Sequence, residues 1–233
     1  MKLVRAFAVA GLALAVLVAF GPASSQDPTA ARVAAVKQWL MQSKAQMKGY
    51  QWIETTVVSH EGEEKSKTTK SCFYDVTGAL QKVEMSSTPP PKTKGGIRGA
   101  IQKDKMKEMS DYMQKAVALV KSYAPPSPEK IQASKDAGKM SVDLLAGGQS
   151  VKLHFKDYHL PGDDLWVTLD TVNNHILALG VSSYIDEPKD AVTLSATVGA
   201  LPDGTGYIEK MTLDATAKKV QVVVTNSGYR KAS

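Results

Sequence analysis

The fold is decided by residues 191–225, which read AVTLSATVGALPDGTGYIEKMTLDATAKKVQVVVT. Apolar and polar residues alternate within 192–198 and again within 219–224, as in a β-strand with one buried and one solvated face. Between the first two expected strands lies Pro202-Asp203-Gly204-Thr205-Gly206, which is rich in turn-forming residues. Because short connections join antiparallel neighbours, this segment predicts a run of antiparallel strands.

Similar strand-like segments, separated by turn-forming residues, fill most of the remaining chain. The expected strands are 50–59, 67–74, 79–87, 140–146, 150–158, 164–170, 175–184, 191–201, 207–215 and 217–225. Ten strands are about the number at which an open sheet must curl or split, because the right-handed twist accumulates from strand to strand. We therefore expect a strongly curved antiparallel sheet.

Two long segments have a helical period instead. The first covers residues 30–48, and the second covers 97–123 with a methionine-rich apolar stripe. A short third helix is expected after Ser127, which suits an N-cap, because Pro128 suits the first helical position and Gly138 suits the end. Small strand side chains cannot fill the concave face of a curled sheet, so we expect the two long helices to cover it.

The predicted fold class is α+β, with an unclosed β-barrel of about ten strands whose concave face is covered by helices. We expect a single domain over residues 26–233, with a hinge at 88–96, where three prolines and two glycines interrupt the pattern. Basic residues gather at and after this hinge, and they are Lys92, Lys94, Arg98, Lys103, Lys105 and Lys107. A solvated helix face explains such a cluster, and so does contact with anionic lipid head groups or an acidic partner.

Residues 1–25 have the pattern of a secretory signal peptide. Lys2 and Arg5 precede an apolar run of about fifteen residues, shorter than the ~20 of a spanning helix, and Ala23-Ser24-Ser25 ends it. We expect cleavage near Ser25 and a soluble periplasmic or secreted product. The expected cleavage point carries no cysteine, so no lipid anchor is predicted.

Net charge and cysteine content argue against a nucleic-acid-binding protein and against a fold held together by disulfides. Without Lys2 and Arg5 the chain has 27 basic and 23 acidic residues, a net charge of +4, so we expect no nucleic-acid partner. The single cysteine, Cys72, cannot form an internal disulfide and is expected to be a buried, inert thiol.

No pattern of catalytic residues is found, and no cofactor is expected. The chain has no Gly-x-Ser-x-Gly sequence. One turn is crowded with potential metal ligands, namely Asp157, His159, Asp163 and Asp164, but their spacing matches no known metal loop, so a tight turn at Pro161-Gly162 explains them better. The histidines of the expected strands, His60, His154 and His175, have no cysteine or aspartate at the spacing of a nucleophile or zinc site. We therefore predict neither a metal site nor an enzyme.

The order of these elements resembles the periplasmic lipoprotein-carrier fold of the LolA and LolB-like outer-membrane lipoprotein-sorting proteins. A signal peptide is followed by a helix that enters a strand through Gly49-Tyr50-Gln51-Trp52, and helices are inserted within a curved sheet. The resemblance is one of layout, and it implies an unclosed barrel with a helical lid and an apolar interior for acyl chains. The gating arginine of the carriers lies in an Arg-Pro-containing strand segment and has no match here, because Arg98 lies in the proline- and glycine-rich region where the second helix begins.

Two functions follow from these features of the sequence. The first is an extracytoplasmic binding protein that holds an acyl chain, lipid or lipidated peptide in an apolar hollow, with transient contact of Lys92, Lys94 and Arg98 with an anionic membrane. The expected lining consists of Trp52, Met106, Met109, Met113, Val117 and Trp166. The alternative is a structural or protein-interaction domain of the same fold, in which the methionine stripe and both tryptophans fill the core and no ligand binds.

Overall fold

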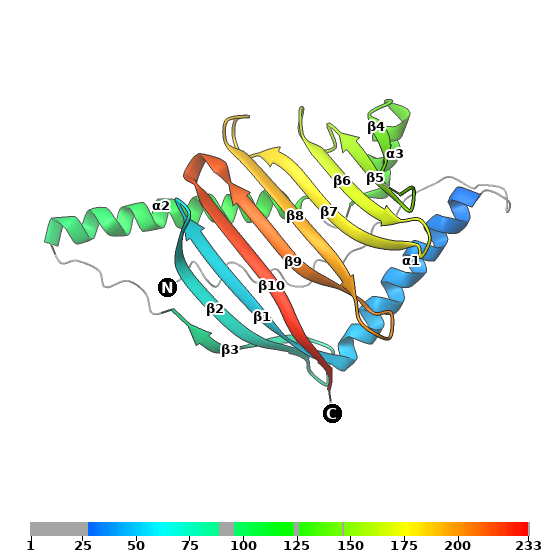
Figure 1. Ribbon diagram of the computed structural model, residues 1–233. Coiled ribbons are helices and arrows are strands. Elements are labelled where there is room, and N and C mark those ends of the chain that lie inside the picture. Colours follow the sequence, from blue (N-terminus) through cyan, green and yellow to red (C-terminus); the bar gives the residue numbers. More distant parts are fainter. Residues whose placement is uncertain (1–27, 89–95, 124–125, 146, 233) are drawn as a thin grey trace.

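The computed structural model describes residues 28–88, 96–123, 126–145 and 147–232, without the side chains of residues 28–30, 96–103 and 128 (Figure 1). The predicted signal peptide and most of the expected hinge lie outside these ranges. The elements are α1 (Pro28–Gln46), η1 (Met47–Gly49), β1 (Tyr50–His60), β2 (Glu63–Tyr74), β3 (Leu80–Ser87), α2 (Gly96–Lys121), α3 (Pro128–Asp136), β4 (Met140–Leu144), β5 (Ser150–Lys156), β6 (Asp164–Asp170), β7 (His175–Tyr184), β8 (Ala191–Ala200), β9 (Gly206–Ala215), η2 (Thr216–Lys218) and β10 (Val220–Lys231).

The ten strands form one sheet in the order β3-β2-β1-β10-β9-β8-β7-β6-β5-β4. Every pair of neighbours is antiparallel. Within the described residues the edge strands β3 and β4 do not pair with each other, so the sheet curves without closing into a barrel (Figure 1). The predicted fold class is confirmed.

The pairing of β1 with β10 determines the connection that the helices must make. These strands pair from Tyr50 opposite Lys231 to His60 opposite Val220. As a result β3 and β4, which follow each other among the strands, lie at opposite edges, about nine spacings or about 43 Å apart along the sheet. The 26 residues of α2 are about 39 Å long. Figure 1 shows α2 running behind the sheet towards α3.

The strands have an inner face, which the helices cover, and an outer face. Inner-face residues follow the register, so that Leu165 of β6 lies between Phe155 of β5 and Val181 of β7, and all three are buried. The main core joins this face to Val36 of α1, Ile131 of α3 and the residues Met113, Ala116, Val117, Val120 and Tyr123 of α2 and the turn after it. The prediction that the two long helices cover the concave face is therefore confirmed.

The helix α1 is held at the β8–β9 connection. Trp39 Nε1 donates to the Gly204 carbonyl at 3.0 Å, and the Trp39 ring stacks on His175 at 4.5 Å between ring centroids. Gly206 N–H donates to Ser43 Oγ at 2.9 Å. A Cβ on Gly206 would lie 2.3 Å from the Trp39 ring, so this close approach requires glycine.

The helix α2 is held at the other end of the strands. Lys115 forms an ion pair with Asp186 in the β7–β8 connection at 3.2 Å. Just after the helix, the Tyr123 hydroxyl bonds to Asp163 and lies 2.8 Å from Ser183 Oγ, at the end of β7. Since the β7–β8 and β8–β9 connections lie at opposite ends of β8, the two long helices are anchored at opposite ends of the sheet.

The predicted elements are all present, although most of them differ from the prediction by one residue or more at one end or both, and three of these differences have a clear cause. The helix α1 ends at Gln46 and not at Lys48, because residues 47–49 form a 3-10 turn into β1. The strand β2 begins at Glu63 because it pairs with β1 up to His60. The strand β10 continues to Lys231 because β1 supplies a partner along its whole length. The N-cap at Ser127 is confirmed, because its side chain accepts from the Lys130 N–H.

The core assignment makes a prediction about stability. Leu165 is 2% exposed, so we expect Leu165→Ala to lower the free energy of unfolding by about 2–5 kcal/mol. Leu144→Ala is the matched control, because Leu144 is 76% exposed and should change stability by less than about 0.5 kcal/mol. Denaturant titration followed by circular dichroism measures both. Equal losses would contradict the placement of Leu165.

Candidate functional site

The inner face has a different character on β1, β2 and β3 from that on the rest of the sheet. Trp52 of β1 lies opposite Cys72 of β2, and two residues along the strand Glu54 lies opposite Lys70. Trp52, Glu54 and Cys72 are buried, but the main core does not include them. This part of the inner face therefore forms a second cluster, in which aromatic and charged groups are neighbours.

A buried ion pair lies within this cluster. Lys82 Nζ of β3 contacts Glu54 Oε2, and the two side chains are only 14% and 9% exposed. Lys82 lies directly opposite Cys72, so the pair crosses β2. Lys70, which faces Glu54 in the register, forms no ion pair among the described residues.

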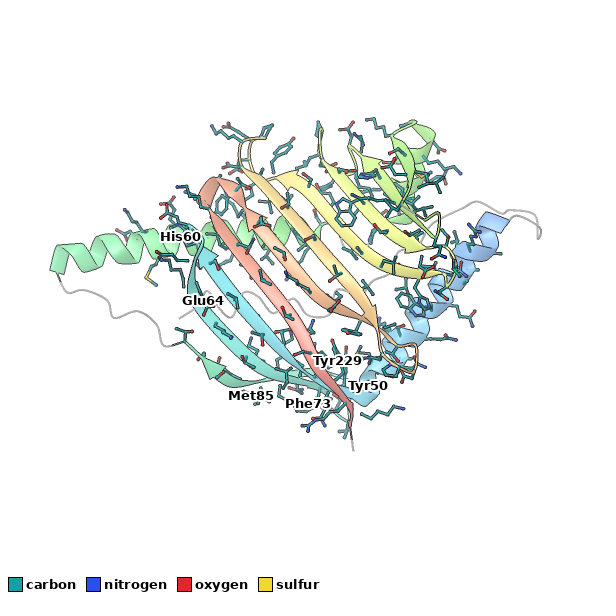
Figure 2. The ribbon with its side chains drawn as sticks, in the orientation of Figure 1. Tyr50, His60, Glu64, Phe73, Met85 and Tyr229 are labelled. Atoms are coloured by element: carbon teal, nitrogen blue, oxygen red, sulfur yellow. The ribbon has the colours of Figure 1, made fainter. Side chains whose placement is uncertain are left out.

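Aromatic side chains gather at the lower end of the same strands. Trp52 packs on Tyr229 of β10 and on Tyr74 of β2, with ring centroids 5.8 Å and 6.0 Å away. Tyr229 in turn packs on Tyr207 of β9 at 4.4 Å. Figure 2 shows Tyr229 close to Tyr50 at this end, whereas His60 and Glu64 lie at the other. We call Trp52, Tyr74, Tyr207 and Tyr229 the aromatic group.

The aromatic group lies where two strands separate. The β9–β10 ladder ends at Lys210 opposite Thr225. Beyond it the Asn226 side chain donates to the Ile208 carbonyl at 2.9 Å and accepts from Trp52 Nε1 at 3.2 Å. These bonds satisfy polar groups that the ladder would otherwise have paired. The sheet is therefore joined here by side chains and not by backbone.

Burial disfavours the ionised forms of two tyrosines and of the thiol in this cluster. It raises the pKa of Tyr229 and Tyr74 above the ordinary value for tyrosine. Burial also raises the pKa of the Cys72 thiol to about 11, with Glu54 adding to the shift and Lys82 and Lys70 opposing it. An activated nucleophile requires a lowered thiol pKa, so Cys72 is unsuited to that role. The prediction of a buried thiol is confirmed.

The predicted lining residues lie in several different environments. Met113 and Val117 are buried in the main core, Met109 packs against its side and Met106 is exposed. Trp52 belongs to the aromatic group. The assignment of these five as a ligand lining stays a prediction, and they do not form one continuous surface among themselves.

Trp166 lies on the outer face, opposite to the placement that we predicted. Its neighbours in β6, Leu165 and Val167, are both in the core, and side chains alternate along a strand. The Trp166 ring lies over Gly180, where a Cβ would be 2.3 Å away, and under Lys152 Nζ at 4.4 Å. Trp166 is therefore left out of the candidate site.

The basic segment is described only in part. Lys92 and Lys94 lie outside the described residues. Arg98 lies in α2, but its side chain is not described. Lys105 and Lys107 follow in the same helix and are exposed.

The acidic turn at 157–164 has a structural explanation. Asp163 is buried, and its Oδ2 accepts from the backbone N–H groups of His159 and Leu160 as well as from Tyr123. In the described part of the chain, no group of three or more His, Cys, Asp or Glu side chains is arranged to hold a metal ion. The turn thus connects α2 to the sheet.

His154 is more enclosed than its sequence context suggested. Its side chain is mostly buried on the outer face, with Nδ1 at 2.6 Å from Asp164 and Nε2 at 3.5 Å from Asp143. These aspartates belong to the strands on either side, so the sequence spacing did not reveal them.

Four residues of this region, Glu54, Lys70, Lys82 and Tyr229, were not predicted from the sequence as members of a site. Glu54 shares the inner face with Trp52 because the two lie two residues apart in β1, whereas the other three share it only because of the register. Gly228, which has a positive φ of 63°, forms a bulge that places Tyr229 beside Trp52. A glycine inside a long β-strand was the one available signal.

The buried thiol leads to a measurable prediction. Raising the thiol pKa from its ordinary value of 9.0 to about 11 leaves about 100-fold less thiolate at neutral pH. We therefore expect native Cys72 to react with a disulfide reagent at least about 100-fold more slowly than in denaturant. Absorbance of the released thiolate measures both rates, and equal rates would contradict the burial.

No family model matches the chain, and no curated protein matches it. Its fold is similar to those of a DUF1329 family protein from Desulfovibrio piger (9% identity, TM-score 0.36, 88% of this chain and 93% of that one) and a LolA superfamily protein from Nitrosomonas europaea (10%, 0.35, 85% and 94%). These descriptions include the family that the order of elements resembles. Because the TM-scores are below 0.5, the fold class is based on the strand order itself.

Proposed function

We propose that this chain is an extracytoplasmic binding protein that holds an acyl chain, a lipid or a lipidated peptide against the inner face of its sheet. One observation carries the proposal, which is that the apolar inner face is wider than its helical cover. Val142 and Leu144 of β4 lie on the inner face, opposite Leu153 and Val151, yet they are 52% and 76% exposed. At the other side, Trp52 lies outside the main core.

The energetics of burial are sufficient for such a ligand. Each buried methylene contributes about 0.8 kcal/mol, so a chain of about ten carbons gains about 8 kcal/mol before the entropy of binding is subtracted. Apolar burial has no direction, which suits a protein that accepts chains of different lengths.

The alternative is a protein-interaction domain with a filled core. Met113 and Val117 favour it, because both are packed against the sheet as ordinary core residues. In that case the exposed apolar residues at the β4 edge would contact another protein, and no lipid would bind.

The proposed location follows from the N-terminal sequence. Residues 1–25 would be removed as a signal peptide, and the mature chain would act outside the cytoplasm. None of the helices that the structure describes is both long and apolar enough to cross a membrane.

We also propose that the start of α2 approaches an anionic membrane. Between residues 92 and 107 the chain has six basic residues and one acidic residue, a net charge of +5. Figure 1 shows the first half of α2 extending beyond the β1–β3 side of the sheet. A projecting basic helix can reach lipid head groups, and each lysine or arginine there contributes about 1 kcal/mol.

Ligand contact can be located with a brominated fatty acid, which quenches the fluorescence of nearby tryptophans. In a Trp39→Phe background, which leaves Trp52 and Trp166 as the two tryptophans of the chain, we expect quenching that persists in Trp166→Phe and is mostly lost in Trp52→Phe, because only Trp52 of these two lies on the inner face. Steady-state fluorescence titration measures the effect. The absence of quenching and binding in the wild type would favour the filled-core alternative. Loss of quenching in Trp166→Phe alone would place the ligand on the outer face.

Membrane contact is tested by charge reversal. We expect the triple variant Lys92→Glu, Lys94→Glu and Arg98→Glu to bind phosphatidylglycerol vesicles at least about tenfold more weakly in a sedimentation assay. Reversal of three exposed lysines elsewhere gives the same change in net charge, and a suitable set is Lys37, Lys189 and Lys210. Equal weakening by both triple variants would show that net charge alone is responsible.

A further inference from the structure

Three charged side chains meet on the inner face between the aromatic group and the upper end of the sheet. In the register, Glu54 of β1 faces Lys70 of β2, and Lys82 of β3 reaches across to contact Glu54. We call Glu54, Lys70 and Lys82 the inner charge cluster. All three influence the pKa of Cys72, which lies on the same face between Lys70 and Trp52.

Stability of the fold does not by itself explain why charged residues occupy these buried positions. Removing two charges from water costs several kcal/mol per ion, and apolar residues of similar volume are often as stabilising as a buried ion pair. The inner face supplies apolar residues at comparable positions, such as Val222 and Val224 of β10. Glu54 and Lys82 thus occupy positions where packing alone would favour aliphatic side chains.

The cluster also has an excess of positive charge. Lys70 and Lys82 both lie near the buried Glu54 carboxylate, and only Lys82 forms an ion pair with it among the described residues. The other carboxylate that faces Lys70 in the register is Glu84 of β3, which is exposed and accepts a bond from Ser87 Oγ at 2.7 Å. Lys70 as a whole residue is half-buried, and it has no ion-pair partner among the described residues.

Polar and apolar surfaces adjoin here in the way that an amphiphile requires. Trp52 and Tyr74 continue the inner face on one side of the cluster, and Val58, which packs against the main core, lies on the other side of it. A head group above Lys70 would leave an attached chain free to follow either apolar surface.

We infer that the inner charge cluster binds the anionic head group of the amphiphile, with Lys70 as the direct contact and Lys82 as the second cation, shared with Glu54. This inference rests on the proposed function and specifies its ligand class: a fatty carboxylate or a lipid phosphate, and not a neutral ester or alcohol. Charge-assisted hydrogen bonds to such an anion are stronger than neutral ones.

The test compares three ligands that share a twelve-carbon chain. Dodecanoate, dodecyl phosphate and methyl dodecanoate compete with the neutral dye Nile red for the full mature chain at pH 8, where both acids are ionised. We expect at least one anion to bind about tenfold more tightly than the methyl ester. The tighter of the two anions identifies the head group as a carboxylate or a phosphate.

Two variants with opposite expected effects on anion binding distinguish head-group binding from a structural role. Lys70→Gln should remove most of the preference for the anion while leaving ester binding unchanged, and Lys67→Gln, an exposed lysine of the same strand, should have no effect. Glu54→Gln removes the competing carboxylate, so it should strengthen anion binding. A structural role predicts weaker binding of every ligand in that variant. Circular dichroism verifies that each variant is folded.

The outcomes separate this inference from the proposed function. Equal affinities for anions and ester in the wild type, or an unchanged preference in Lys70→Gln, would overturn the inference while the acyl-binding proposal stands. Failure of all three ligands to displace or exclude the dye would overturn both. Tighter anion binding in Glu54→Gln, together with its loss in Lys70→Gln, would support it.

Discussion

The arrangement of the molecule depends on one constraint, which is that the pairing of β1 with β10 sends β3 and β4 to opposite edges of a ten-stranded sheet. The chain must then cross the whole sheet between these two strands. A helix of about 39 Å makes the crossing with all of its internal backbone bonds satisfied, which an extended connection over an apolar surface would not achieve. The helical cover of the inner face is thus a consequence of strand order.

The same constraint explains why the cover is incomplete. The helix α2 follows one end of the strands, where it is tied to the β7–β8 connection, whereas α1 is tied to the β8–β9 connection at the other end. Among the residues described, the ring contacts of Trp52 and the ion pair of Glu54 involve side chains of the strands and not of either helix. Charged and aromatic residues are found on this side, and the main core is on the other.

The sequence was sufficient to predict the fold because each level of the pattern agrees with the next. Alternation in 191–225 specified half-buried strands, and Ser127 and Pro128 specified a helix start. The sequence was insufficient to predict the register of strand pairing, because alternation along one strand does not specify which residues of the next strand lie opposite. Trp52 and Trp166 looked equivalent as aromatic residues on strands, yet their neighbours place them on opposite faces. Glu54 and Lys82 are 28 residues apart in the sequence, and they come into contact only because β2 pairs with both β1 and β3. The last strand was expected to end at residue 225, although Gly228 is a bulge within a continuing strand.

The strength of the contacts along α2 indicates the side from which the inner face can be reached. At the end of the helix, Tyr123 is buried and bonded to Asp163 and Ser183, so this end is firmly held. Core packing continues back along the helix to Met113, with Met109 partly buried against it. Closer to the start, the ion pair of Glu108 with Lys218 is at the surface, where such a pair contributes at most about 1 kcal/mol. Resistance to displacement therefore decreases towards the start of α2. The least firmly held part of α2 therefore lies on the β1–β3 side of the sheet, which also carries the inner charge cluster and the aromatic group.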